Sequence, residues 1–106
     1  MAQPPKRFLD FLEQHEAVGE AYQALGEATT KAGPLDEKAV RLIKLGISIG
    51  MRHEGAVHAH ARKALAAGCT PEELRHTALL ATTTLGFPSM MAAYSWVEDI
   101  LASGSA

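Results

Sequence analysis

The sequence predicts an all-α fold, a helical bundle of about five helices. Alternating apolar and polar runs are absent, and apolar residues instead recur at helical spacing along nearly the whole chain. The length of 106 residues fits a single domain over positions 1–106. Hydrophobic residues make up 47% of the chain and charged residues only 21%. A chain this small has a small core, which cannot bury all of these apolar side chains. We therefore expect a homo-oligomer.

The helix ends carry sequence signals. The expected helices cover about residues 6–31, 37–51, 54–67, 71–85 and 90–101. Pro34 cannot continue the first helix, and Asp36 is suited to cap the second. Thr70 and Glu73 have the spacing of a capping box, and Ser89 is the expected N-cap of the last helix.

Charge and composition exclude several classes of protein. The net charge is −2 and no basic stripe is present, so we expect no nucleic-acid partner. No apolar run approaches the roughly 20 residues that span a bilayer, and MAQPPKRFLDFLEQ has no apolar stretch typical of a signal peptide. The single cysteine, Cys69, rules out an internal disulfide and fits a reducing compartment. These features predict a cytoplasmic protein.

Three histidines lie close together in MRHEGAVHAHARKALAAGCT, residues 51–70. At about 100° per residue on a helix, His53 and His60 fall within about 20° of each other, whereas His58 points about 140° away from His53. Ala56 lies on the same stripe and leaves room beside the two rings. One interpretation is acid–base chemistry at His60 with His53 beside it. The other is a core histidine bonded to backbone.

The same segment offers little to a metal ion or a thiol reaction. His53 and His60 lie about 10 Å apart along the helix axis, too far for one ion. Glu54 and His58 form an i,i+4 pair, which is more often a surface contact than a metal site. Cys69 precedes a helix N-terminus that can lower the pKa of its thiol, but no second cysteine is present to resolve an intermediate. We expect no metal and no cofactor.

Several stretches together resemble the carboxymuconolactone decarboxylase family, which includes alkylhydroperoxidase D (AhpD)-like proteins. They are LDEKAVRLIKLGISIG, the pattern H-x7-G-x-T-x-E-E-L that starts at His60, and G-x-P at Gly86. The resemblance covers about residues 33–101. It implies an all-α fold assembled into trimers or hexamers.

The resemblance implies two chemistries, and the first needs a pair of cysteines. AhpD-like members use C-x-x-C, a histidine four residues later and an upstream glutamate to reduce or relay disulfides. Carried over by position, the histidine is His60, the cysteines fall at His53 and Ala56, and the glutamate falls at Arg41. Cys69 lies outside this arrangement. The nucleophile of this chemistry is a thiolate, which His53 and Ala56 cannot supply. Peroxiredoxin activity is therefore suggested by family membership only, and not by the residues at these positions.

The decarboxylase branch lacks the cysteines and opens a lactone with loss of carbon dioxide. That loss leaves an enolate-like charge, which a proton donor and a cation stabilise. The resemblance therefore favours a lyase in which His60 and His53 are catalytic. Arg41 is the candidate to bind the substrate carboxylate. The predicted partner is a small anionic carbonyl compound.

Two alternatives remain open from the residues. Arg41 is an i+4 neighbour of Glu37 and, with Lys44 and Ser48, makes an ordinary polar helix face. A protein that kept the helical scaffold and lost its site would be a non-catalytic oligomer.

Overall fold

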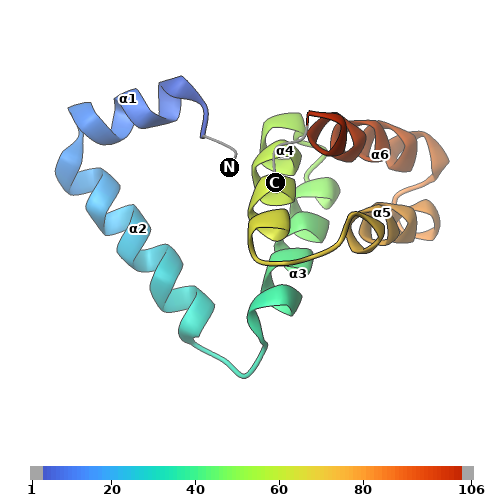
Figure 1. Ribbon diagram of the computed structural model, residues 1–106, viewed down its shortest axis with the longest axis horizontal. Helices are drawn as coiled ribbons and strands as arrows, with labels where there is room; N and C mark the ends of the chain where they lie inside the picture. The colour runs from blue at the N-terminus through green and yellow to red at the C-terminus, as the bar shows by residue number, and fades with distance from the viewer. Residues whose placement is uncertain (1–3, 104–106) are drawn as a thin grey trace. The chain divides into compact units, whose positions relative to one another are not determined.

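The structure, a computed structural model, describes residues 4–103, and these form helices and no strand. The helices are α1 Lys6–Gln14, α2 Glu16–Lys31, α3 Glu37–Gly50, α4 Glu54–Ala66, α5 Pro71–Leu79, the 3-10 helix η1 Leu80–Thr83, and α6 Phe87–Ala102 (Figure 1). The all-α class is confirmed. None of the helices in these residues is long and apolar enough to cross a membrane. The chain divides into two compact units, whose described parts are residues 4–35 and 36–103.

The first unit is a helical hairpin. The single helix expected over residues 6–31 is wrong, because the chain leaves helical geometry at His15 with φ −127° and ψ 64°. A Cβ atom on Gly19 would lie 2.7 Å from Cδ2 of Leu12, so glycine there lets α1 fold back onto α2. Because of this break, residues 4–103 hold six α-helices where about five were expected.

The second unit holds the hydrophobic core. Helix α4 packs against α3 and α6, and α5 packs against α3 and α6. The buried core side chains are Leu45, Ile49, Val57, Ala61, Ala64, Cys69, Leu74, Ala78, Ala81, Met90, Ala93, Val97 and Ile100. Many of them are alanines, which let neighbouring helices approach closely.

The predicted N-caps of α3 and α5 are confirmed. Oδ1 of Asp36 accepts a hydrogen bond from the N–H of Ala39 at 2.8 Å. Thr70 Oγ1 accepts from the Glu73 N–H at 3.1 Å, and Glu73 Oε1 accepts from the Thr70 N–H at 2.8 Å. This reciprocal pair satisfies two backbone donors that have no partner inside the helix.

Two helix ends need a left-handed residue. Gly68, after α4, has φ 96°, which glycine adopts without steric cost. After α3 the same role falls to Arg52, with φ 54°. For a residue with a side chain this conformation costs about 1–2 kcal/mol. The Arg52 Nε–H donates to Oγ of Ser89 at 3.1 Å, which links the end of α3 to α6.

The boundary between α5 and α6 differs from the prediction at both ends. The helix expected to reach residue 85 leaves α-geometry after Leu79. Thr82 and Thr84 donate their hydroxyls to the carbonyls of Leu79 and Leu80, and β-branched residues favour helices weakly. Helix α6 begins before Ser89, with Gly86 as its N-cap, because Pro88 is tolerated in a first turn.

Removing the capping hydroxyl of α5 is expected to destabilise the protein. Thr70→Ala leaves the Glu73 N–H without its acceptor and should lower the free energy of unfolding by about 1 kcal/mol, as for other N-caps. Urea denaturation followed by circular dichroism measures this change. Thr70→Ser keeps the acceptor and should stay within a few tenths of a kcal/mol of the wild type. Equal losses in both variants would show that the capping bond is not the cause.

Candidate functional site

His60 lies on α4 with a half-buried ring. Its Nδ1 atom is buried and has no hydrogen-bond partner among residues 4–103. Buried polar atoms are nearly always hydrogen-bonded, so an unpartnered ring nitrogen needs an explanation. The unpartnered Nδ1 atom also argues against the interpretation of His60 as a core histidine whose ring is hydrogen-bonded to the backbone.

Positive charge gathers around His60. Arg41 and Lys44 are one turn apart on α3, which packs against α4, and Lys63 follows His60 by one turn on α4. We call these four residues the cationic cluster. Burial lowers the pKa of His60 below its ordinary value, and the positive charges of the two lysines and Arg41 lower it further. The ring is therefore neutral at pH 7.

Burial and two of the same positive charges lower the pKa of Lys63. Although much of its side chain is exposed, partial burial lowers the pKa of its ammonium group, and the charges of Arg41 and Lys44 lower that pKa further. Like charges repel one another, and a bound anion would relieve that repulsion. The cluster thus has the electrostatics of an anion site.

No carboxylate of the described residues neutralises the cluster. Within residues 4–103, the side chains of Arg41, Lys44 and Lys63 form no ion pair. The pairing of Arg41 with Glu37 is absent. The polar face expected for α3 is also wrong at Ser48, which is only 2% exposed and donates its hydroxyl to the Leu45 carbonyl at 2.7 Å.

His53 has a different place from the one that the helical wheel assigned to it. It is the N-cap of α4 with extended backbone, φ −112° and ψ 106°, so the wheel direction is wrong for this residue. Its Nδ1 accepts a hydrogen bond from the N–H of Ala56 at 3.0 Å. The ring lies over Gly55, where an added Cβ would be 3.2 Å from Cε1 of His53. Only Nε2 of this ring is left for other chemistry.

Cys69 is a buried core residue. It is 4% exposed, and its thiol lies 3.8 Å from the carbonyl oxygen of Lys38. Burial raises the pKa of the thiol, and the negative charge of Glu73 raises it further. The lowering expected from the helix N-terminus is therefore wrong. A protonated, buried thiol is a poor nucleophile.

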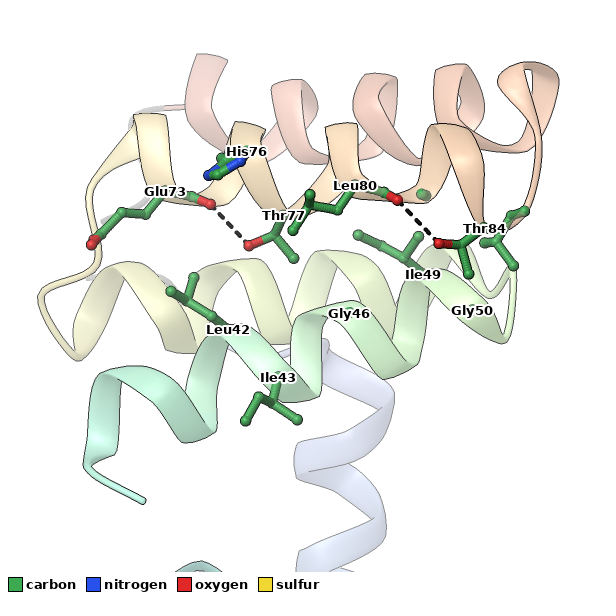
Figure 2. Close-up of a pocket in the computed structure, with 12 residues that line it drawn as sticks. Leu42, Ile43, Gly46, Ile49, Gly50, Glu73, His76, Thr77, Leu80 and Thr84 are labelled. Carbon is green, nitrogen blue, oxygen red and sulfur yellow. Dashed lines mark hydrogen bonds between the residues drawn. The ribbon is translucent and has the colours of Figure 1, made fainter. Parts of the chain in front are cut away.

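A groove of about 560 Å³ lies between α3 and the α5–η1 segment (Figure 2). Its lining is Leu42, Ile43, Gly46, Ile49, Gly50, Glu73, His76, Thr77, Leu80, Ala81, Thr84 and Leu85. The hydroxyls of Thr77 and Thr84 are already bonded to helix carbonyls, at 2.9 and 3.3 Å. His60, His53 and Arg41 are not part of this lining. The groove is therefore a mainly apolar surface separate from the cationic cluster.

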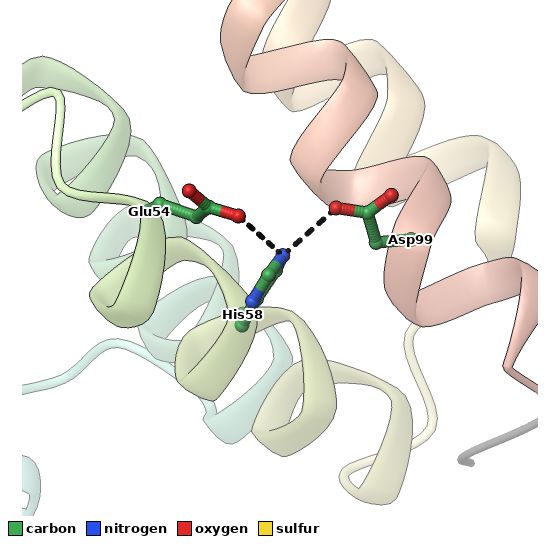
Figure 3. A group of neighbouring side chains, drawn as sticks. All are labelled: Glu54, His58 and Asp99. Atoms are coloured by element: carbon green, nitrogen blue, oxygen red, sulfur yellow. Dashed lines mark hydrogen bonds and ion pairs between the residues drawn. The ribbon is translucent and has the colours of Figure 1, made fainter.

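Sequence reasoning missed three charged residues. Lys63 lies three residues after His60, and this i,i+3 spacing could have indicated that the two side chains are neighbours on one helix face. Lys44 was assigned to a polar face. Asp99 lies 3.1 Å from Nε2 of His58, and no sequence signal points to it because 41 residues separate the two (Figure 3).

A model of the carboxymuconolactone decarboxylase family matches residues 16–99. The chain belongs to the carboxymuconolactone decarboxylase family. The crystal structure of apo-lpg0406, a member of this family from Legionella pneumophila, superposes with a TM-score of 0.78 and 26% identity, over 92% of this chain and 87% of that one. An uncharacterized protein of Haemophilus influenzae is 38% identical over 59 residues, 56% of this chain and 52% of that protein. The chain thus spans about half the length of this curated relative.

The lowered pKa of His60 makes stability depend on pH. The unfolded histidine binds its proton near pH 6.5 and the folded one only at lower pH. The unfolded state therefore binds more protons in this window, and the free energy of unfolding falls as pH drops below about 6.5. His60→Gln should remove that part of the pH dependence.

An NMR titration of the His60 ring checks the cause. Lys63→Gln should raise the pKa of His60 toward its ordinary value, because Lys63 is the largest charged contributor. Lys38→Gln is the matched control, since Lys38 pairs with Glu73 and does not act on His60. A His60 pKa at or above 6.5 in the wild type would contradict the cluster's electrostatics.

Proposed function

We propose that this member of the carboxymuconolactone decarboxylase family binds a small anionic carbonyl compound at the cationic cluster and performs acid–base chemistry on it at His60. The observation that carries the proposal is the buried, unpartnered Nδ1 of His60 beside three cations that have no carboxylate partner in the described residues. A bound anion supplies both the missing hydrogen-bond partner and the missing negative charge.

The proposed step is a decarboxylation of the lactone type. The bond between the leaving carboxylate carbon and the neighbouring carbon breaks, and its electron pair moves toward the carbonyl to form an enolate. Arg41, Lys44 and Lys63 stabilise the negative charge on oxygen, because fixed cations in a partly desolvated site act strongly. His60 then delivers a proton to the carbon. A bound anion offsets the neighbouring cations and raises the pKa of His60, so the ring takes up that proton when the substrate binds.

His53 is proposed as an auxiliary residue. Its Nδ1 is held by the Ala56 N–H, so the neutral ring has its proton on Nε2 and can act only as a hydrogen-bond donor there. A peroxidase has no supporting observation, because the buried Cys69 thiol has a raised pKa. A scaffold without catalysis is the remaining alternative, and it predicts that the wild type neither binds nor converts a small anionic carbonyl compound.

The proposed protein is a single-domain homo-oligomer, a trimer or hexamer as the family implies, in the cytoplasm. The family match over residues 16–99 includes helices from both compact units, which supports one domain. Large apolar side chains along the second unit support the oligomer, since Ile43 is 47% and Leu80 61% exposed in the groove. Burying such side chains in an interface contributes about 25 cal/mol for each Å² removed from water.

Activity should depend on His60. With carboxymuconolactone as the probe, His60→Ala should lower kcat/KM by at least about 100-fold, the usual contribution of a general acid. Arg41→Gln should mainly raise KM. His15→Gln, on an exposed histidine of the other unit, should change neither. Carbon dioxide release and calorimetric binding of the lactone measure these effects.

The scaffold alternative predicts a different result. If the folded wild type neither binds nor converts carboxymuconolactone or the 3-oxo acid oxaloacetate, the proposed function is wrong. It is equally wrong if His60→Ala and the control His15→Gln behave alike toward every ligand that binds. Unchanged helical content by circular dichroism keeps misfolding from being mistaken for loss of function.

The oligomer should depend on the groove. Light scattering after gel filtration is expected to give three or six times the chain mass of 11.3 kDa. Ile43→Glu and Leu80→Glu together should lower that mass, because charges are costly in an apolar interface. Ala66→Glu, at an exposed position of α4, should leave it unchanged. A wild-type mass of one chain at micromolar concentration would refute the oligomer.

A further inference from the structure

Three potential metal ligands meet between α4 and α6 (Figure 3). Nε2 of His58 lies 3.1 Å from Oδ2 of Asp99 and 3.9 Å from Oε2 of Glu54. The ligand atoms of all three residues lie within 4.8 Å of one another. Glu54 and His58 share one face of α4 through their i,i+4 spacing, and the packing of α6 on α4 brings Asp99 to them.

One imidazole does not satisfy both carboxylates. A neutral ring has a single N–H donor, which at 3.1 Å serves Asp99, whereas Glu54 is beyond hydrogen-bond distance. Within residues 4–103, neither carboxylate forms an ion pair with a lysine or an arginine. Two negative charges therefore converge on one nitrogen, and a divalent cation between them would neutralise both.

We propose that Glu54, His58 and Asp99 bind a divalent transition-metal ion of the Zn²⁺ type. Bonds of 2.0–2.2 Å in tetrahedral geometry place neighbouring ligand atoms about 3.4 Å apart. The observed 3.1 and 3.9 Å bracket that spacing, and the largely exposed Glu54 side chain is free to close the difference by rotating. One imidazole nitrogen with two carboxylate oxygens favours Zn²⁺ over Mg²⁺ or Ca²⁺, which prefer all-oxygen sites. Water completes the coordination.

This site is separate from the proposed function. His58 and His60 are two residues apart on α4, so their side chains point about 160° away from each other. The cationic cluster lies toward α3, whereas the three ligands join α4 to α6. A metal there cross-links two core helices and stabilises the folded state, because it binds the folded chain and not the dispersed ligands of the unfolded one.

The test is zinc binding to the full chain after treatment with a chelator. Competition with a chromophoric chelator, using ZnCl₂ alone, should give one ion per chain and a higher melting temperature with zinc than without. Asp99→Asn and Glu54→Gln should each weaken zinc binding at least 10-fold, since even the loss of an outer-shell partner costs 10–100-fold. His15→Gln, which removes an exposed histidine of the other unit, should not change the affinity.

Zinc binding by the wild type and by the ligand variants can contradict the proposed metal site. The metal-free variants should keep the helical content of the wild type, and Asp99→Asn retains a side-chain oxygen to accept from His58. If the wild type binds no stoichiometric zinc, the site does not exist. If Asp99→Asn and Glu54→Gln bind zinc as the wild type does, the ion sits elsewhere. Because carboxymuconolactone turnover is not read here, failure of this proposal leaves the proposed function untouched.

Discussion

The packing of α4 through small side chains is the constraint on which the second unit depends. Val57, Ala61 and Ala64 recur at i, i+4 and i+7 and are each fully buried. Small residues on this stripe let α3 and α6 approach the same helix from two sides. The packing of α6 on α4 consequently brings Asp99 within 3.1 Å of His58.

The two sides of α4 carry opposite charge. Toward α3, burial lowers the pKa of both the His60 ring and the Lys63 ammonium, and the positive charges of Arg41 and Lys44 lower both further. Toward α6, two carboxylates meet at His58. Like charges held near one another oppose folding, so a ligand of opposite charge would stabilise either cluster. Binding sites often have this character, whereas a purely structural ion pair is neutralised within the chain.

Family membership and site chemistry answer different questions in this protein. The fold and the match over residues 16–99 establish the carboxymuconolactone decarboxylase family. The residues at the site select among its chemistries, because a fold hosts more than one reaction. In this chain His60 has a buried, unpartnered ring nitrogen within the described residues, whereas Cys69 is buried in the core. A buried thiol with a raised pKa is a poor nucleophile.

The sequence by itself determined the helical class, the caps at Asp36 and Thr70, and the family, because these depend on local periodicity and on short motifs. The break at His15 escaped prediction, since it depends on Leu12 packing over Gly19 rather than on any helix-breaking residue. The partners of the charged side chains were likewise decided only by tertiary structure. Asp99 reaches His58 across 41 residues because α6 packs on α4, and the approach of α3 to α4 brings Arg41 close enough to act on His60. Spacing along one helix predicts which residues share a face, but the charge that face meets belongs to another helix.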